Sequence, residues 1–290
     1  MLAHRWTASD LPDLSSRTVV VTGASSGLGL VTARELARVG ARVVLAVRDQ
    51  TKGEKAASTM PGDVEVRTLD LSDLSSVRAF VATWTGDLDI LINNAGIMRV
   101  PETRTVDGFE LQMATNYLGA FALTNLLLPN ITDRVVTVSS FLHRQGRIDL
   151  EDFNSQHRSY KPFQAYNDSK LADLMFALEL QRRLTRTGSS VRSFAAHPGL
   201  ASTNLFGHFR GFEGAVTNLF AQDAEHGALP TLYAATQDLP GASYVGPDGF
   251  QQLRGYPTIV RPSKSARNSR VGKRLWELSA KLTATWSVVI

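Results

Sequence analysis

The stretch Thr18-Val19-Val20-Val21-Thr22-Gly23-Ala24-Ser25-Ser26-Gly27-Leu28-Gly29 decides the fold. It is a β-branched run, then a turn with three glycines, and residues 30–37 continue it with a helical pattern. A buried parallel strand that passes through a glycine turn into a helix directs backbone N–H groups and the positive end of the helix dipole at one point. That point suits a phosphate group. The alternative is that the glycines serve only a tight turn and close packing of the helix.

Strand and helix patterns alternate along the rest of the chain. Five further strands are expected at residues 42–47, 64–68, 88–92, 134–138 and 191–196. We expect one long helix at 107–128 and another, amphipathic with a buried stripe, at 164–185. Six alternations predict a single α/β domain over 1–290 with a doubly wound, mostly parallel, Rossmann-type sheet. Pro230, inside the helical pattern of 224–236, predicts a kink or a break.

Ligands of such sheets bind beyond the carboxyl ends of the strands. The second strand ends at Arg48, with Lys52 nearby and no acid for a ribose hydroxyl, which favours NADP(H) over NAD(H) because arginine accepts a 2′-phosphate. The alternative is that Arg48 pairs with a surface acid such as Asp49. Asp70, after the third strand, is expected either to accept from the adenine amino group or to cap a helix that begins near Ser72.

Tyr166-Asn167-Asp168-Ser169-Lys170 places a phenol and an ammonium four residues apart, on one face of the predicted helix. At about 4 Å and an effective dielectric near 20, the two charges attract by roughly 4 kcal/mol, which would lower the tyrosine pKa from about 10 to about 7. A general acid/base titrates in that range. Because the same spacing is common on solvated helix faces, the prediction depends on the other motifs.

Six motifs in order closely resemble the short-chain dehydrogenase/reductase family. They are Thr22-Gly23-x-x-x-Gly27-x-Gly29, Asn93-Asn94-Ala95-Gly96, Asn116, Ser139-Ser140, Tyr166-x-x-x-Lys170 and Pro198-Gly199-x-x-x-Thr203. The resemblance covers roughly residues 15–250. The stretch 147–163, with Ser169-Lys170-Leu171-Ala172, resembles the branch that contains retinol dehydrogenases and light-dependent protochlorophyllide reductase.

The resemblance implies a role for each matching residue. Tyr166 would be the general acid/base, Lys170 would lower its pKa and hold the nicotinamide ribose, and Ser140 would position the substrate oxygen. Asn116 would hold a water that relays protons to Lys170, and Thr203 would bind the nicotinamide carboxamide. The cofactor-binding residues expected from the motifs are Gly23, Ser25, Ser26, Gly27, Leu28, Gly29, Arg48, Asp70, Leu71, Asn93, Ala95, Gly96, Tyr166, Lys170, Pro198, Gly199 and Thr203.

Composition excludes several classes of protein. The chain has 290 residues, 43% of them hydrophobic, no cysteine and a formal net charge of +4. Without cysteine there is no disulfide framework or thiolate metal site, and the six histidines have no metal-ligand spacing, so we expect no metal. The first residues contain no secretory signal and no apolar run is long enough for a membrane span, so we expect a cytoplasmic protein.

Two late segments carry the remaining predictions. Aromatic residues among glycines at about 203–225 predict an apolar lid and a lipophilic carbonyl or alcohol substrate, although they would also suit packing of the loop or a contact in a homo-oligomer. The basic helix at about 265–282 is expected to be a solvated face, or else to bind a polyanion; no motif supports nucleic acid.

Rival functions are also open. They are a non-catalytic NADP(H)-binding regulator, a sugar-nucleotide epimerase or dehydratase that uses a similar Tyr-Lys pair, and a hydrolase built on Ser140 and His143. The hydrolase lacks the glycine pattern of a nucleophile elbow around its serine. The epimerases and dehydratases usually show a different glycine spacing and a longer C-terminal domain. The regulator has no need of Ser140, Tyr166 and Lys170 together.

Overall fold

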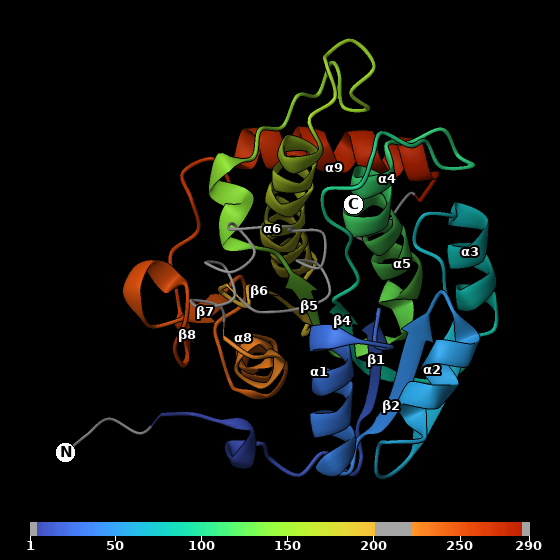
Figure 1. Ribbon diagram of the computed structural model, residues 1–290, viewed down its shortest axis with the longest axis vertical. Helices are drawn as coiled ribbons and strands as arrows, with labels where there is room; N and C mark the ends of the chain where they lie inside the picture. The colour runs from blue at the N-terminus through green and yellow to red at the C-terminus, as the bar shows by residue number, and fades with distance from the viewer. Residues whose placement is uncertain (1–4, 201–221, 286–290) are drawn as a thin grey trace, which may run out of the picture.

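An eight-stranded sheet forms the centre of the molecule (Figure 1). The computed structural model describes residues 5–200 and 222–285. Strand order is β3-β2-β1-β4-β5-β6-β7-β8, with β1 to β7 parallel and β8 antiparallel to β7. This confirms the predicted single α/β domain with a mostly parallel, Rossmann-type sheet.

The strands are β1 (Thr18–Thr22), β2 (Arg42–Val47), β3 (Val64–Thr68), β4 (Leu88–Asn93), β5 (Ile131–Val138), β6 (Arg192–Ala196), β7 (Tyr244–Pro247) and β8 (Pro257–Ile259). The α-helices are α1 (Gly27–Arg38), α2 (Gln50–Ala57), α3 (Leu74–Ala82), α4 (Leu111–Met113), α5 (Gly119–Leu127), α6 (Pro162–Arg186), α8 (Ala224–Thr236) and α9 (Ser269–Thr283). A π-helical segment, η2 (Ala114–Leu118), joins α4 to α5.

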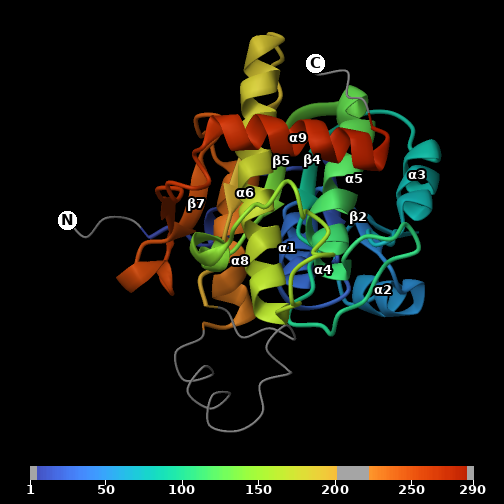
Figure 2. The same cartoon turned by 90° about the horizontal axis from the view of Figure 1, so that it is seen from above.

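Helices cover both faces of the sheet because successive strand side chains point to opposite faces. Val19 and Val21 of β1 pack in the core that α1 and α8 cover, whereas Val20 packs in the core under α3, α5 and α6. Helix α9 lies across α6 and α5 (Figure 2). Both faces are therefore apolar, and the edge at the carboxyl ends of the strands is left for ligands.

The predicted helix at 107–128 is wrong in its start and in its regularity. The Glu110 carboxylate accepts from the backbone N–H groups of Gln112 and Met113, so the helix begins at Leu111. A π-helical turn then interrupts the α-helix around Asn116. Single π-turns inside α-helices frequently mark functional sites.

Two other helix predictions need correction. The helix predicted at 164–185 is not amphipathic in its middle, because every residue from Ala165 to Leu180 is buried. Helix α6 is therefore a central element covered on all sides, and Pro162 lies in its first turn, where no N–H is needed. Pro230 does not end α8, which runs on to Thr236 with Leu229 and Leu232 buried against the sheet.

The basic C-terminal helix is α9. Its buried face carries Leu275, Trp276 and Ala280, and the Trp276 ring stacks on Phe176 of α6 with centroids 5.6 Å apart. Its basic side chains face outwards, and Arg274 pairs with Glu151 at 3.1 Å. Among the helices of residues 5–200 and 222–285, none has the length and apolar character of a membrane span. Most of the predicted lid at 203–225 lies outside the described residues.

Candidate active site

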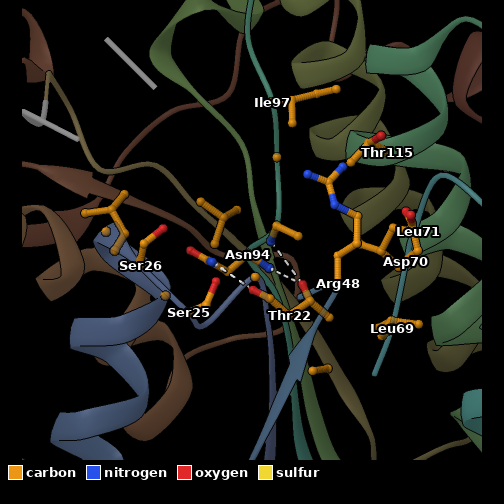
Figure 3. Close-up of a pocket in the computed structure, with 18 of the residues that line it drawn as sticks. Thr22, Ser25, Ser26, Arg48, Leu69, Asp70, Leu71, Asn94, Ile97 and Thr115 are labelled. Carbon is orange, nitrogen blue, oxygen red and sulfur yellow. Dashed lines mark hydrogen bonds between the residues drawn. The ribbon is translucent and has the colours of Figure 1, made fainter. Parts of the chain in front are cut away.

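A cavity of about 370 Å³ opens at the carboxyl ends of β1 to β5 (Figure 3). Its walls come from the glycine turn after β1, from the ends of β2 and β3, from the loop after β4, and from β5 and α6. The predicted residues that line it are Gly23, Ser25, Ser26, Gly27, Leu28, Gly29, Arg48, Asp70, Leu71, Ala95, Gly96, Tyr166, Lys170 and Pro198. Residues from five of the six motifs thus share one cavity, and Asn116, the sixth, does not line it.

Glycines shape the phosphate-sized turn between β1 and α1. Gly23 has a φ of +67°, and a Cβ there would lie 2.8 Å from the Ala95 Cα. A Cβ on Gly29 would lie 2.6 Å from the carbonyl oxygen of Gly23 and would also meet the Asn94 side chain. Ser26, at the N-cap of α1, makes no side-chain capping bond. The first N–H groups of α1 are therefore not capped by that serine, and they face the cavity.

Thr22 and Asn94 tie this turn to the loop after β4. The Thr22 hydroxyl accepts from the backbone N–H groups of Asn94 and Ala95, each at 3.0 Å, and the Asn94 amide donates to the Thr22 carbonyl at 2.8 Å (Figure 3). The predicted residue Asn93 instead donates to Thr124 of α5 at 2.8 Å, behind the sheet. Asn94 was missed, although it follows a buried strand within the same motif.

Arg48 lies exposed at the end of β2 and lines the cavity (Figure 3). The Asp49 carboxylate pairs with Lys52 at 3.2 Å and accepts from the Lys52 backbone N–H at 3.0 Å. Within the described part of the chain, the Arg48 guanidinium makes no hydrogen bond or ion pair at close range. Hydrogen bonds from Lys52 are the main cause of the lowered pKa of Asp49, and the charge of Arg48 adds a smaller part, so Asp49 interacts more strongly with Lys52 than with Arg48.

Asp70 does not cap a helix near Ser72. Helix α3 begins at Leu74, and Asp73 is its N-cap, accepting from the Ser75 N–H at 2.8 Å. The Asp70 carboxylate accepts from the Ser72 N–H at 2.8 Å and from the Ser72 hydroxyl at 2.6 Å. Asp70 and Leu71 both line the cavity. Asp70 therefore belongs to a turn at the rim of the cavity, and its contact with an adenine amino group stays a prediction.

Tyr166 and Lys170 share the face of α6 that points to the cavity. The Lys170 ammonium lies 6.0 Å from the centroid of the Tyr166 ring and donates to the Val138 carbonyl at 2.9 Å. It also donates to the Asp173 carboxylate at 2.8 Å. All three side chains are buried, and Met98 and Leu142 pack on Tyr166. The ammonium is thus shared between the phenol and a second acid.

The expected fall of the Tyr166 pKa towards 7 is not found in this structure. Burial raises the pKa of the Tyr166 phenol above its usual range, and the Lys170 ammonium and the Ser140 hydroxyl offset only part of the rise. The pKa expected from the sequence assumed that the Lys170 charge lies about 4 Å from the phenol oxygen and has no counter-charge. Burial of the phenol and the carboxylate of Asp173 are the two causes it omitted.

Asn116 and the serines after β5 hold the active-site backbone. The Asn116 amide accepts from the Ile97 N–H at 2.8 Å and donates to the Ile97 carbonyl at 3.0 Å and to the Ser169 hydroxyl at 2.9 Å. Ser139 donates to the Lys170 carbonyl at 2.7 Å. Ser140 is buried, accepts from the Leu142 N–H at 3.2 Å, and lies near enough to the Tyr166 phenol to affect its pKa.

The loop after β6 closes the remaining side. Pro198 lines the cavity, while Gly199 has a φ of +67° and lies behind it against the Leu253 backbone. His197 is fully buried, and its Nδ1 accepts from the Gly199 N–H at 3.2 Å, so it belongs to the turn. Thr203 lies outside the described residues.

Comparison with known proteins agrees with this geometry. Residues 17–213 match the family described as short chain dehydrogenase. The chain belongs to the short-chain dehydrogenase family. Retinol dehydrogenase 13 from Homo sapiens is 40% identical over 291 residues, covering 93% of this chain and 85% of the relative. Polyprenol dehydrogenase from Mus musculus is 37% identical over 294 residues, covering 94% and 85%.

A solved structure extends the likeness to the whole fold. It is that of an uncharacterized protein from Mycobacterium Paratuberculosis, which is 57% identical, covers 97% of this chain and 98% of that one, and superposes with a TM-score of 0.88. The predicted family and its retinol dehydrogenase-like branch are therefore confirmed. This short-chain dehydrogenase is an oxidoreductase that acts on CH–OH or C=O groups.

Members of this family bind nicotinamide cofactors, and the residues of the cavity suit such a group. The glycine turn leaves backbone exposed where a side chain would collide, and the N-terminus of α1 lies beside it without a serine cap. A cationic side chain stands at the end of β2, one strand away. These are the contacts that a dinucleotide requires for its pyrophosphate and its ribose.

Proposed function

We propose that this short-chain dehydrogenase transfers hydride between NADP(H) and a lipophilic alcohol or carbonyl compound, with Tyr166 as the general acid/base. One observation carries the proposal: a single cavity joins the glycine turn, the guanidinium of Arg48 and the Tyr166–Lys170 pair. Each of the three has a separate task. The regulator and the hydrolase do not need all of them, and the epimerases and dehydratases usually show a different glycine spacing.

The cofactor would lie along the carboxyl ends of the strands. The backbone of Ser25 to Leu28 and the N-terminus of α1 would hold the pyrophosphate, and Arg48 would pair with a 2′-phosphate. Asp70 and Leu71 would flank the adenine. Ala95, Gly96, Lys170 and Pro198 line the remaining length towards Tyr166, where the ribose and nicotinamide would lie.

A bound nicotinamide supplies or accepts the hydride, and the side chains of this chain orient the substrate and move its proton. The Tyr166 hydroxyl would give its proton to the substrate oxygen in reduction and take it back in oxidation. The Ser140 hydroxyl would hold the same oxygen. Asn116, bonded to Ile97 and Ser169, would keep the loop after β4 at a fixed distance from α6.

Two observations support a lipophilic substrate. Met98, Leu142 and Tyr166 form one hydrophobic cluster, with Phe141 packed against it, so the ring that carries the reactive hydroxyl has apolar neighbours. Two similar proteins are named for retinol and polyprenol, which are both long hydrocarbon alcohols. An apolar pocket binds such chains through buried area, with few polar contacts to orient the reacting group.

A carbonyl panel tests this proposal. Retinal, farnesal and decanal are compared with dihydroxyacetone and glyceraldehyde, each with NADPH and with NADH, by following cofactor absorbance. We expect kcat/KM to be highest for the long-chain aldehydes with NADPH. Activity limited to the small polar carbonyls would contradict the lipophilic substrate, and equal rates with NADH would contradict the cofactor preference.

A further inference from the structure

Asp173 is a buried acid one helical turn below Lys170, on the same stripe of α6 as Tyr166 and Lys170. Asp173 is 1% exposed, and its Oδ2 accepts from the Lys170 ammonium at 2.8 Å. Its other oxygen, Oδ1, is buried and has no hydrogen-bond partner among the described residues. A carboxylate in such a place is costly unless its charge is compensated, and Lys170 is the compensating group.

We propose that Asp173 is a positioning residue: it holds the Lys170 ammonium and compensates its charge, which weakens the pull of that charge on the Tyr166 proton and so suits the site to carbonyl reduction. The inference rests on the proposed role of Tyr166 as the proton donor. In reduction the phenol must begin protonated, whereas oxidation of an alcohol needs the phenolate. At neutral pH an acid beside the lysine therefore leaves a larger share of the enzyme in the phenol form that starts reduction, without changing the equilibrium of the reaction.

The groups around Asp173 leave Lys170 as its only cationic neighbour in the described part of the chain. On α6 the titratable neighbours are Lys170 and Tyr166. From η2 comes Tyr117, whose hydroxyl bonds with Ser279 of α9 at 2.8 Å and whose pKa burial raises, with a smaller contribution from Asp173. On the side of the sheet that α5 and α6 cover, strand β4 carries Asn93 and strand β5 carries Thr137, and both side chains are uncharged. Helix α5 and the buried face of α9 carry no charge.

The pKa directions agree with the geometry. Burial raises the pKa of Asp173 to about 6, although Lys170 acts in the opposite direction. Burial alone would lower the pKa of Lys170, but the charges of Asp173 and Tyr166 outweigh it and raise the pKa. For Tyr166, burial is the main cause of the raised pKa and Asp173 adds to it, while Lys170 acts against both.

A direct titration of Tyr166 tests the proposal without a substrate. Phenolate absorbance is measured against pH for the wild type and for Asp173→Asn, each corrected with the corresponding Tyr166→Phe protein. Asn has the same shape and can still accept from Lys170, so only the charge is lost. We expect the Tyr166 midpoint to fall by about one pH unit. An unchanged midpoint would overturn the proposal.

Two further variants control for a merely structural effect. Asp173→Glu keeps the charge, so the Tyr166 midpoint is expected to stay at its wild-type value. If Asp173→Asn folds poorly, Asp173→Ser removes the charge instead and is compared with Asp173→Glu. Asp168→Asn removes a second buried acid of α6, which pairs with Arg158 at 3.1 Å and not with Lys170. A shift of the same size in Asp168→Asn or Asp173→Glu would contradict the proposal.

Kinetics then separate this inference from the proposed function. With the most active aldehyde of the panel and its alcohol, each at saturating substrate and cofactor, Asp173→Asn should raise the rate of oxidation (kcat) at neutral pH several-fold relative to the rate of reduction. If Tyr166→Phe remained active, the proposed function itself would fail. If Tyr166→Phe were inactive and Asp173→Asn kept the wild-type ratio of the two rates, only the role of Asp173 would fail.

Discussion

At the scale of single residues, we propose that the choice of cofactor depends on Arg48. The end of β2 carries no acid for a ribose hydroxyl, and the neighbouring Asp49 is occupied by Lys52. A guanidinium at this place can form two charge-assisted hydrogen bonds with a phosphate, and it gains less from a pair of neutral hydroxyls, which carry no opposite charge. On this proposal, the side chain discriminates between the two cofactors by its charge.

Arg48→Ala should weaken NADPH binding by about 10- to 100-fold, the loss expected for a charge-assisted pair, and leave NADH binding nearly unchanged. Fluorescence titration with both cofactors measures the effect. Arg42→Ala is the matched control, because Arg42 lies at the opposite end of the same strand and pairs with Glu65 at 2.8 Å. Equal losses for NADPH and NADH in Arg48→Ala would contradict the assignment.

At this scale, the sequence predicts which side chains lie on the same face of α6, but it does not predict which of them form ion pairs. Tyr166 and Lys170 were predicted as neighbours, and they are. The prediction of a lowered tyrosine pKa was wrong because spacing does not show burial, and because Asp173 lies at another helical spacing from Lys170. Asn93 and Asn94 are adjacent in the sequence, and only the pleat of β4 decides which of the two faces the cavity.

At the scale of elements, the close packing of α1 on the glycine turn and on the loop after β4 shapes the proposed phosphate site. Gly29 lies at the closest point, where a Cβ would be 2.6 Å from the Gly23 carbonyl oxygen. Any side chain there must push α1 away from the turn, because backbone cannot yield as a flexible side chain can. The position of α1, and with it the aim of its N-terminal N–H groups, depends on this one glycine.

Gly29→Ala should destabilise the fold by about 1–3 kcal/mol and weaken NADPH binding, because the helix shifts away from the pyrophosphate site. Gly272→Ala in α9 is the matched control: its Cβ would meet nothing closer than 3.6 Å, so it should stabilise by about 0.5–1 kcal/mol through helix propensity. Urea unfolding and a cofactor titration check both variants. Equal stability changes in the two would contradict close packing at Gly29.

Elements with strong periodicity were predicted from the sequence, and those fixed by local hydrogen bonds or by tertiary packing were not. Strands β1 to β6 were found because β-branched runs are buried on both faces. Strands β7 and β8 have four and three residues, too few for a pattern. The start of α4 depends on the Glu110 cap, and the burial of α6 on α9, which is distant in the sequence.

At the scale of the whole molecule, two neutral histidines join the active-site loops to the core. His143 bonds through Nδ1 to the Ser140 carbonyl at 2.7 Å and accepts at Nε2 from the Ser263 N–H at 3.3 Å. Burial lowers the pKa of His143 to about 4 and that of His197 to about 3. The unfolded chain takes up these protons near pH 6.5, so the folded state loses stability as the pH falls below that value.

The free energy of unfolding should therefore fall by about 2 kcal/mol per histidine between about pH 7 and about pH 5. Urea unfolding at both pH values gives the loss for the wild type, for His143→Gln and for His197→Asn. Each variant should show a smaller loss than the wild type. The control His157→Gln replaces an exposed histidine and should match the wild type. An undiminished loss in both buried variants would contradict the assignment.

The central claim is that one cavity brings a bound dinucleotide, a substrate oxygen and the Tyr166 hydroxyl together. Its most direct test is the rate of substrate-dependent NADPH oxidation in wild type and Tyr166→Phe, with NADPH binding measured on the same samples. We expect kcat/KM to fall by about 10²- to 10⁴-fold, the usual contribution of a general acid, while NADPH affinity stays nearly unchanged. Undiminished turnover in Tyr166→Phe would contradict the account.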